Sequence, residues 1–403
     1  MSDLETPPVR QAGIARHGRL GASHPILGVL RLLGVGTVVL AVSASSIVAI
    51  DTYLTVANTP TFDLPGQPSG PPPDIGAMEG GFNILIVGSD RGETEQEIKD
   101  RGGAELNDVT MIVHVSGDHT RAVAVSIPRD MVVPIPSCPK KDGSGNYPSM
   151  AGQPINVTLS YGGMPCTVLT VEALTGLHID FAGLITFQGV IEMSNAVGGV
   201  PVCLAQAIHD KDSGFYAEAG THVLQGTGAL QFLRSRKAVG NGSDLTRISS
   251  QQVFLSSLVR TIKSEDTINN PVKLYSIAQA AVTNMELSSN FRNTDTLISI
   301  AKALNTLELD QVTFVQYPGT TGGTGIYAGK VKPTTSVANQ VFAKILADEP
   351  FALTANGDGT GSVLDPNAVP APPTTTDPDA PPVEVIAGLT GQTAAAQTCS
   401  KGR

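Results

Sequence analysis

Acidic and basic side chains stand at the ends of three apolar runs of this 403-residue chain. Asp90 and Arg91 follow the run NILIVGS, Asp108 precedes the run VTMIVHV, and Arg129 follows the run AVAVSIP. Such runs predict strands, and in open α/β sheets the ligand crevices lie at strand ends. Carboxylates flanked by guanidinium groups suit a divalent cation bound together with a phosphate or pyrophosphate. A set of turn, cap and surface ion-pair residues is the alternative that spacing alone leaves open.

A second cluster of cationic side chains lies between residues 234 and 251. Arg234 and Arg236 leave the end of one predicted helix, and Arg247 stands in the next. Arg247 and Gln251 are four residues apart and therefore share a face of that helix, for which Asp244 is the predicted N-cap. The planar guanidinium fork matches phosphate oxygens in a bidentate manner, so the cluster predicts an anion site. A solvated helix face with ion pairs between its turns is the alternative.

The overall charge argues against nucleic-acid binding. The chain has a net charge of −10 and no Trp, whereas nucleic-acid binding calls for a basic surface and often for stacking aromatic rings. The segment TGGTGIYAGKV has some likeness to a nucleotide-binding loop, but Thr324 replaces its first glycine and Val331 replaces its Ser or Thr. We therefore expect neither a nucleic acid nor a nucleotide as a partner.

The N-terminal part carries the signals of a membrane anchor. Residues 32–50 contain no charged side chain, and this run is close to the roughly 20 residues that span a bilayer. Arginines precede the run and Asp51 follows it, so the positive-inside rule places the N-terminus in the cytoplasm. We expect a disordered cytoplasmic tail over residues 1–25, a transmembrane helix over 26–50 and a Pro/Gly-rich extracytoplasmic linker over 51–80. A cleaved signal peptide and a buried helix are the alternatives.

Strand and helix patterns alternate over residues 81–350, which we expect to form the folded domain. Strands are predicted at 83–87, 110–115, 122–126 and 311–316, and helices at 166–175, 188–197, 226–234, 245–262 and 294–303. This alternation predicts the α/β class, with a sheet covered on both faces. Residues 351–403 are predicted to form a flexible Pro-rich tail, whose apolar patch at 383–389 is either a vestige of a further domain or a short docking strand.

The four cysteines favour export into an oxidising compartment. No pair of them has the spacing of zinc ligands. Cys138 and Cys166 both lie in loop-like sequence and form the preferred bridge, which leaves Cys203 with Cys399. The other pairings, and four unpaired thiols, stay open at this point.

The motifs along the chain resemble the LytR-CpsA-Psr family of cell-envelope glycopolymer transferases. The resemblance rests on NILIVGSDR, NDVTMIVHV, AVAVSIPRDMVVPIP, INVTLSYGG, LTVEALTG, MSNAVGGV, VLQGTGALQFLRSR and SDLTRISSQQVFL, which lie in this order between residues 82 and 265. Each motif alone is weakly specific, whereas the ordered set is highly specific.

The resemblance implies a fold and a reaction. The fold would be an α/β/α sandwich with a central mixed sheet and an apolar lipid cleft, preceded by one N-terminal transmembrane helix. Residues 81–350 would be the catalytic domain of a phosphotransferase of cell-wall assembly. It would move a glycopolymer from a polyprenyl-pyrophosphate carrier to a hydroxyl of peptidoglycan. The protein would be a single-pass protein of the cell membrane, with its catalytic domain outside the cytoplasm.

The resemblance also implies roles for the residues of the two clusters. Asp90 and Asp108 would hold Mg²⁺ or Mn²⁺ against the pyrophosphate, and either carboxylate could take the proton of the acceptor hydroxyl. The residues that would bind the pyrophosphate are Arg91, Arg129, Arg234, Arg236, Arg247 and Gln251, and Asp244 would orient them. Of these, Arg91 and Arg129 would join Asp90 and Asp108 as catalytic residues.

Two other functions would use the same arginines. One is a non-catalytic polyprenyl-phosphate-binding protein of wall assembly, which would not need Asp90 and Asp108. The other is a hydrolase that cleaves the lipid pyrophosphate with water as the acceptor. The presence of both aspartates favours an enzyme over the first, and rates with and without a sugar acceptor separate a transferase from the second.

Overall fold

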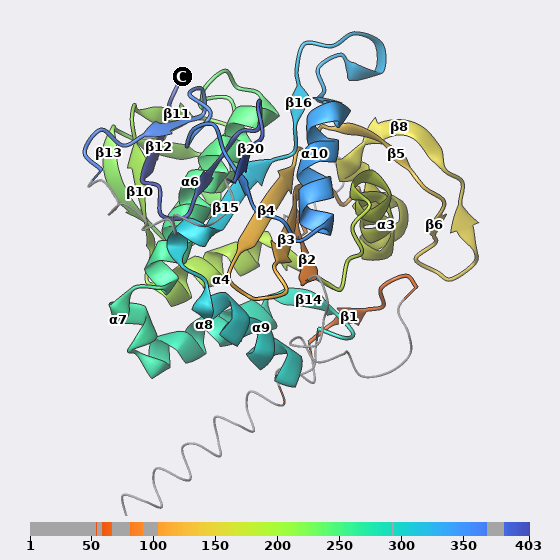
Figure 1. Cartoon of the computed structure of the whole chain (residues 1–403), viewed down its shortest axis with the longest axis horizontal. Helices are drawn as coiled ribbons and strands as arrows, with labels where there is room; N and C mark the ends of the chain where they lie inside the picture. Colours follow the sequence, from red (N-terminus) through yellow and green to blue (C-terminus); the bar gives the residue numbers. More distant parts are fainter. Residues whose placement is uncertain (1–53, 55–58, 67–80, 92–103, 292–293, 369–382) are drawn as a thin grey trace, which may run out of the picture. The chain divides into compact units, whose positions relative to one another are not determined.

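A computed structural model describes residues 54, 59–66, 81–91, 104–291, 294–368 and 383–403 (Figure 1). The chain from Tyr53 to Arg403 forms one compact unit. The predicted cytoplasmic tail over 1–25 and the predicted transmembrane helix over 26–50 lie outside the described residues. Within the described ranges, no helix combines the length and the apolar character that crossing a membrane requires.

A mixed sheet of eight strands occupies the centre of the described part of the chain (Figure 1). In spatial order its strands are β1 (Thr61–Phe62), β14 (Met285–Ser288), β9 (Phe181–Thr186), β2 (Phe82–Ser89), β3 (Asn107–Val115), β4 (Ala122–Ile127), β15 (Val312–Gln316) and β21 (Gly391–Thr393). The pairs β1–β14, β9–β2 and β4–β15 are parallel, and the other neighbours are antiparallel. The four predicted strands correspond to β2, β3, β4 and β15, and the prediction of a mixed sheet is confirmed.

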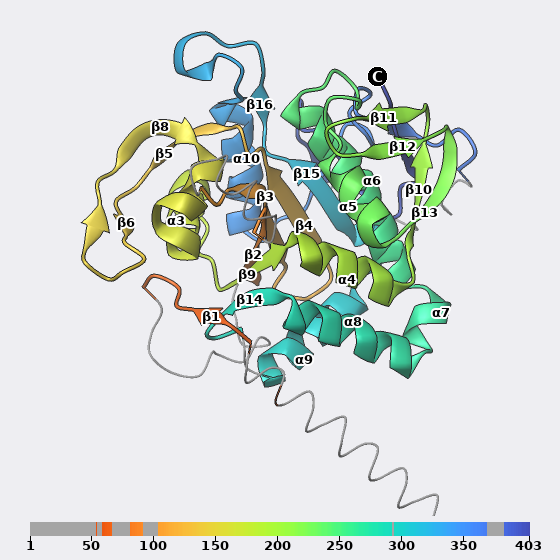
Figure 2. The same cartoon turned by 180° about the vertical axis from the view of Figure 1, so that it is seen from behind.

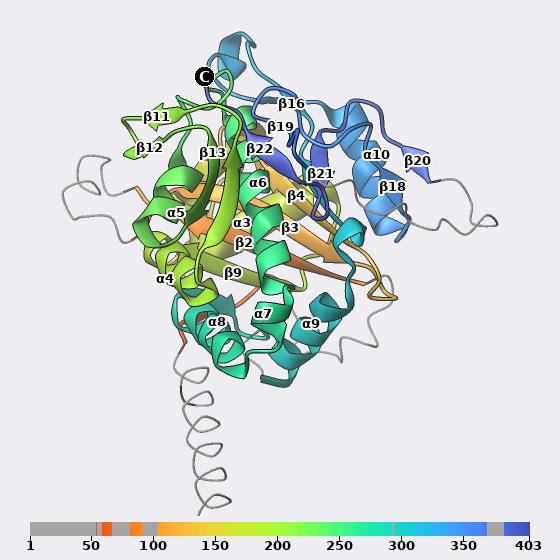
Figure 3. The ribbon, with the colours of Figure 1, turned by 90° about the vertical axis from the view of Figure 1, so that its left-hand side faces the viewer.

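Helices cover both faces of this sheet, as Figure 3 shows. The helices are α3 (Thr158–Thr175), α4 (Phe187–Val197), α5 (Gly226–Arg234), α6 (Asp244–Ile262), α7 (Glu265–Ile268), α8 (Pro271–Thr283), α9 (Thr294–Thr306) and α10 (Thr335–Leu346). Side chains of α3 and α10 pack against one face, and side chains of α6 and α9 pack against the other. The five predicted helices correspond to α3, α4, α5, α6 and α9, and the α/β class is confirmed.

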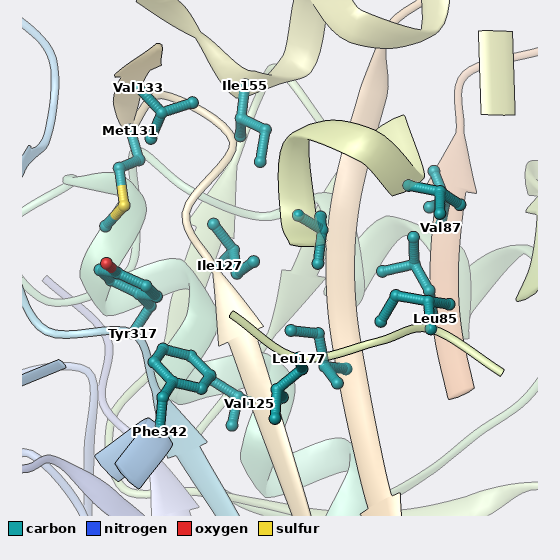
Figure 4. Packing of buried hydrophobic residues seen from close by; sticks show 14 of the residues in the cluster. Leu85, Val87, Val125, Ile127, Met131, Val133, Ile155, Leu177, Tyr317 and Phe342 are labelled. Carbon is teal, nitrogen blue, oxygen red and sulfur yellow. The ribbon is translucent and has the colours of Figure 1, made fainter. Parts of the chain in front are cut away.

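The core under α3 and α10 is built from alternating strand residues (Figure 4). Leu85 and Val87 of β2 point into this core, whereas Ile84 and Ile86, which alternate with them, pack in the core under α9. The period of two places successive side chains on opposite faces of a strand, so a run of apolar residues fills both layers. Fully burying a side chain such as Leu85 stabilises the fold by about 1.5–3 kcal/mol.

Smaller sheets flank the central one. A four-stranded sheet has the order β13 (Gly220–Leu224), β10 (Val200–Leu204), β22 (Thr398–Ser400) and β19 (Ser362–Leu364). The two-stranded sheets pair β5 (Val132–Ile135) with β8 (Met150–Pro154), β6 (Cys138–Pro139) with β7 (Asn146–Tyr147), β11 (Ile208–Asp210) with β12 (Phe215–Ala217), β16 (Gly319–Thr320) with β17 (Lys332–Pro333), and β18 (Phe351–Ala352) with β20 (Glu384–Val385). Short 3₁₀ helices occur at Ile155–Val157, Leu309–Gln311 and Gly325–Tyr327.

Both preferred disulfides are present. Cys138 is bonded to Cys166, and this bridge ties the β6–β7 hairpin to α3. Cys203 is bonded to Cys399, and these two residues face each other in the parallel pair β10–β22.

The prediction of a flexible tail over residues 351–403 is wrong for the part of it that the structure describes. Strand β21 forms an edge of the central sheet, and β22 lies between β10 and β19. The apolar patch at 383–389 docks on the domain, because β20 pairs with β18 and Ile386 and Leu389 are buried. The low-complexity composition of residues 369–382 obscured these short strands, and residues 369–382 lie outside the described residues.

Two local predictions also need correction. The predicted linker over residues 51–80 includes β1, which pairs in parallel with β14, so the folded unit begins before residue 81. The N-cap of α6 is Ser243, whose side chain accepts a hydrogen bond from the Thr246 N–H, and Asp244 is the first helical residue. Ser243 has the extended backbone conformation that a cap residue needs.

Candidate functional site

The register of three central strands brings Asp90, Asp108 and Arg129 to one edge of the central sheet, namely the edge that the ends of these strands form. Ser89 of β2 pairs with Asn107 of β3, and the register shifts by a bulge between Gly88 and Ser89. The antiparallel pairing of β3 with β4 then places the end of β4, and Arg129 after it, beside the start of β3. The Leu106 N–H donates to Asp90 Oδ1 over 3.0 Å, which fixes the chain where it enters β3.

An ion-pair network joins this edge to the first turn of α6; its α6 members Asp244 and Arg247 are buried, and Asp108 and Arg129 are partly buried. Arg129 Nη1 donates a hydrogen bond to Asp108 Oδ1, and Arg129 Nε lies 3.9 Å from Asp244 Oδ1. Arg247 Nη2 lies 2.7 Å from Asp244 Oδ1 and donates to the carbonyl oxygen of Asp108 over 3.0 Å. The structure therefore brings four of the predicted site residues, from three separate segments, into one cluster.

A second layer of ion pairs holds Arg236 beside the cluster. Arg236 Nη2 lies 3.2 Å from Asp130 Oδ2, and Lys330 Nζ lies 3.5 Å from Asp130 Oδ1. Asp210 at the end of β11 accepts hydrogen bonds from the backbone N–H groups of Arg236 and Ala238. Burial by itself raises the pKa of Asp210, but these and other backbone N–H donors outweigh it and hold the pKa below its usual value.

Asp108, Arg129, Arg236 and Arg247 line a cavity of about 590 Å³ between the sheet edge and α4, α5 and α6. These three helices lie side by side in Figure 2. The basic lining residues of the cavity are Arg129, Arg234, Arg236, Lys237 and Arg247, against the acids Asp108, Asp210 and Asp212. The cavity wall thus carries more basic than acidic side chains, although the net charge of the chain is −10.

The cavity is polar at one end and apolar at the other. Along α6, Arg247 and Gln251 are followed on the wall by Leu255 and Leu258, and along β3 Asp108 is followed by Met111. From residue 247 to residue 258 the helix advances about 16 Å. Apolar side chains from four other elements line the same cavity: Ile86, Ile185, Val190, Met193, Leu230 and Leu233.

Arg234 and Gln251 complete the polar end. The Arg234 guanidinium lies 4.6 Å from the centroid of the Phe187 ring, a cation–π contact between the end of α5 and the start of α4. Gln251 Nε2 donates to the carbonyl oxygen of Leu233 over 2.9 Å, which ties α6 to α5.

Several buried polar atoms of the network have no hydrogen-bond partner among the described residues. They are Arg129 Nε, Arg247 Nε and both carboxylate oxygens of Asp244. Burial lowers the pKa of Arg247 despite the neighbouring Asp244. Burial also acts to lower the pKa of Arg129, but the carboxylates of Asp108 and Asp244 outweigh it and raise that pKa. A cluster of buried charges with spare donors is suited to binding a multiply charged anion.

Arg91 lies apart from this cluster. Its guanidinium donates to Glu105 over 2.7 Å and also to Glu286, and it lines a separate cavity of about 300 Å³ with Lys140 and Lys141. The structure therefore does not bring Arg91 to the larger cavity. Asp90 is buried at the same sheet edge as Asp108 but does not line that cavity.

Sequence reasoning missed Asp130, Asp210 and Lys330 as parts of the site. Asp130 and Lys330 are 200 positions apart, and Asp210 precedes Arg236 by 26 positions. No periodicity links such distant residues. The adjacency of Asp130 to Arg129 was the one signal that could have pointed to it.

The acidic residues of the site offer carboxylate oxygens that bear on metal binding. Among the described residues, the only group of three candidate ligands in close range is Cys203, Asp365 and Cys399, and its sulfurs are in a disulfide. Asp90 and Asp108 lie at neighbouring strand ends and supply carboxylate oxygens. Mg²⁺ commonly uses one or two protein carboxylates, with water and phosphate oxygens as further ligands. The donor set therefore fits Mg²⁺ bound together with a phosphate-containing ligand.

Comparison with solved structures supports the fold. A protein of Streptococcus agalactiae aligns with a TM-score of 0.54 at 21% identity, over 66% of this chain and 87% of the other. A LytR-Csp2A-Psr enzyme from Actinomyces oris aligns with a TM-score of 0.52 at 18% identity, over 71% of this chain and 95% of the other. At these identities the likeness shows the fold alone.

Comparison with sequences identifies the family. The cell wall biosynthesis protein LcpA of Corynebacterium glutamicum is 32% identical over 296 residues, which cover 67% of this chain and 56% of LcpA. The polyisoprenyl-teichoic acid–peptidoglycan teichoic acid transferase TagT of Bacillus subtilis is 27% identical over 59% of this chain and 69% of TagT. The chain spans about half the length of LcpA and of the related LcpB. The model of the LytR_cpsA_psr family matches residues 37–343, and the chain therefore belongs to the LytR-CpsA-Psr family.

Proposed function

We propose that this protein transfers a glycopolymer from a polyprenyl-pyrophosphate carrier to a hydroxyl of peptidoglycan during cell-wall assembly. One observation carries the proposal: the 590 Å³ cavity joins a basic end to an apolar end. A pyrophosphate with a polyprenyl chain has the same division, with charge at one end and hydrocarbon at the other. Membership of the family and the name of the relative TagT point to the same class of reaction.

The arginines would bind the pyrophosphate at the basic end. Arg129 and Arg247 are fixed by Asp108 and Asp244, and within the described residues the Nε–H of each makes no hydrogen bond. Arg236 is fixed by Asp130, and Arg234 lines the same end. Guanidinium groups held by carboxylates lose little conformational freedom when the anion binds, so they favour binding. Gln251 would add an amide contact to the same end.

The transfer itself needs positioning and charge neutralisation. The oxygen of the acceptor hydroxyl would attack the phosphorus that carries the glycopolymer. The bond from that phosphorus to the bridging oxygen would break, and polyprenyl phosphate would leave. Asp90 or Asp108 would take the proton of the hydroxyl. The fixed arginines would stabilise the charge that develops on the phosphoryl oxygens.

A metal ion fits this proposal. Mg²⁺, or Mn²⁺ in its place, would be held by Asp90 and Asp108 and would neutralise part of the pyrophosphate charge. Arg91 is not in contact with the arginine cluster. We therefore propose that Arg91 acts indirectly, by fixing the turn that it shares with Asp90 to Glu105 and Glu286.

The location follows from the same proposal. A polyprenyl carrier is confined to a membrane, so the cavity must open where a lipid chain can enter it. The uncharged run at residues 32–50 would supply the membrane anchor, with the catalytic domain outside the cytoplasm.

The proposal is tested by a transfer assay with a short-chain polyprenyl-pyrophosphate-linked saccharide and a soluble peptidoglycan fragment. We expect the phosphodiester product and polyprenyl phosphate from the unaltered protein, and loss of both from Arg129→Ala and Arg236→Ala. Arg121→Ala is the matched control, because Arg121 pairs with Asp348 outside the cavity.

Three other outcomes would contradict the proposal. Release of polyprenyl phosphate at an equal rate without the acceptor would indicate a hydrolase. Binding of the carrier without turnover would indicate a non-catalytic binding protein. Full transfer by Arg129→Ala and Arg236→Ala would show that the arginine cluster is not the pyrophosphate site.

A further inference from the structure

The loop between α5 and α6 carries part of the polar end of the cavity. It extends from Ser235 to Ser243 and presents Arg236 and Gly242 to the cavity wall. One side of the loop is anchored by Asp210, through the backbone N–H groups of Arg236 and Ala238. The position of the Arg236 guanidinium thus depends on how firmly this loop is held.

The other side of the loop is held by Lys401, Gly402 and Arg403, which we call the strap. The Gly240 N–H donates to the carbonyl oxygen of Lys401 over 3.0 Å, and the Arg403 N–H donates to the carbonyl oxygen of Ala238 over 2.9 Å. Val239, whose side chain is fully buried, forms an antiparallel bridge with Gly402. The loop therefore lies between Asp210 and the strap, and backbone groups make the strap contacts.

The strap is itself fixed to the second sheet. Cys399, two residues before Lys401, is bonded to Cys203, and Ser400 pairs with Leu204 in β10. The hydroxyl of Ser400 lies 2.7 Å from that of Ser250, which precedes Gln251 on α6. The Lys401 N–H donates to the carbonyl oxygen of Gly361 over 2.9 Å. The strap is thus anchored independently of the loop that it holds.

At Gly402 the strap lies directly against the backbone of Ala207. A Cβ atom added there would lie 2.1 Å from the carbonyl oxygen of Ala207. Since that atom belongs to the backbone, the strap would have to move away to accommodate even a methyl group. The bridge to Val239 would move with it.

We infer that the strap is a positioning element of the anion site, and that Gly402 lets it hold the loop so that Arg236 is preorganised for the pyrophosphate. This inference rests on the proposed function for the identity of the ligand. The strap touches no ligand itself. It acts by keeping the Arg236 backbone ordered before binding, so that less conformational freedom is lost when the anion binds.

The test uses the full chain, a chain that ends at Ser400, and Gly402→Ala. The shortened chain keeps Cys399, its disulfide and β22, but lacks the strap. Affinity for inorganic pyrophosphate is measured by calorimetry, and the exchange of the Gly240 amide hydrogen is measured by mass spectrometry. We expect both variants to bind about tenfold more weakly and to exchange the Gly240 amide faster, with folding intact by circular dichroism. Lys401→Ala is the matched control, because it keeps the backbone contacts, and we expect no change in it.

A double-mutant cycle separates positioning from general stability. If the strap acts through Arg236, removing it from Arg236→Ala should cause no further loss of affinity. An equal further loss in that background, or full affinity in the shortened chain, would overturn the inference while leaving the proposed function intact. If the unaltered chain does not bind pyrophosphate, the proposed function and the ligand named here are both contradicted. If the Gly240 amide exchanges at an unchanged rate in the shortened chain, the strap does not hold the loop, whatever the affinity shows.

Discussion

Arg247 and Asp244 form an ion pair of 2.7 Å across the first turn of α6, with side chains 5% and 1% exposed. The pair is incompletely satisfied, because neither Asp244 oxygen accepts a hydrogen bond of good geometry within the described structure and Arg247 Nε has no partner there. Burying two charges in this way costs more free energy than an apolar pair would. An arrangement that works against stability is expected where the charges serve binding.

The first prediction concerns the stability of this pair. Arg247→Ala should lower the free energy of unfolding by about 3–5 kcal/mol, because it leaves the buried Asp244 carboxylate without its nearest cationic partner. The double variant Asp244→Leu/Arg247→Met should lose much less, since neither charge remains buried. Urea unfolding followed by circular dichroism measures both. A double variant as unstable as the single one would show that the pair itself stabilises the fold.

The second prediction separates charge from geometry at Arg129. Its guanidinium faces Asp108 and Asp244 together, a geometry that an ammonium group cannot reproduce. We expect Arg129→Lys to keep the fold but to reduce the rate of transfer about 10²–10³-fold, the loss seen when one donor to a developing charge is removed. Initial rates at saturating carrier measure this loss. A rate within twofold of the unaltered protein would show that a positive charge suffices at this position and that the guanidinium geometry is not needed.

The strands and helices that build the site were predictable because their patterns are local. The apolar run of β2 and the stretch of α6 without Gly or Pro each specify an element within about twenty residues. The positions of Asp90, Asp108, Arg129 and Arg247 at element ends follow from them. That Arg129 meets Asp108 also follows, once the strands pair.

The remaining contacts depend on tertiary structure that sequence spacing does not encode. Asp210 reaches the Arg236 loop only because the β11–β12 hairpin folds against α5. Arg91, which follows β2, meets Glu286 of β14 because the sheet places β14 two strands away from β2. The strands after residue 350 are two or three residues long and have no apolar period of their own. They are held by pairing and by the Cys203–Cys399 bridge, which appear only when the fold is assembled.

The third prediction compares the two disulfides. The Cys203–Cys399 bridge closes a loop of 196 residues and the Cys138–Cys166 bridge one of 28. In the chain-entropy account, losing them should cost about 5 and about 3.5 kcal/mol respectively. We therefore expect Cys203→Ser/Cys399→Ser to unfold at a lower urea concentration than Cys138→Ser/Cys166→Ser. The reverse order would show that native contacts of the β6–β7 hairpin outweigh loop entropy.

The fourth prediction is a pH dependence at Asp210. Although burial acts to raise the pKa of this carboxyl, its backbone N–H donors lower it below the usual value. A group with a depressed folded-state pKa contributes stability above its unfolded pKa, which is about 3.9 for Asp, and loses that contribution as the pH falls through the lower folded-state pKa. Asp210→Asn should therefore be less stable than the unaltered chain at pH 6. The difference should shrink below pH about 4, and a difference independent of pH would refute the assignment.

The fifth prediction tests the apolar end of the cavity. Leu258 lies on α6 about three turns after Arg247 and lines this end. Leu258→Trp would fill part of the space that the lipid chain would occupy, so we expect weaker binding of a polyprenyl-pyrophosphate carrier and unchanged binding of inorganic pyrophosphate. Leu346→Trp is the matched control, because Leu346 is 59% exposed at the end of α10 and does not line the cavity. Calorimetry with both ligands measures the split. Equal binding of the carrier by Leu258→Trp and the unaltered chain would place the lipid elsewhere. A parallel loss of both ligands would show that the substitution disturbs the arginine cluster rather than the apolar wall.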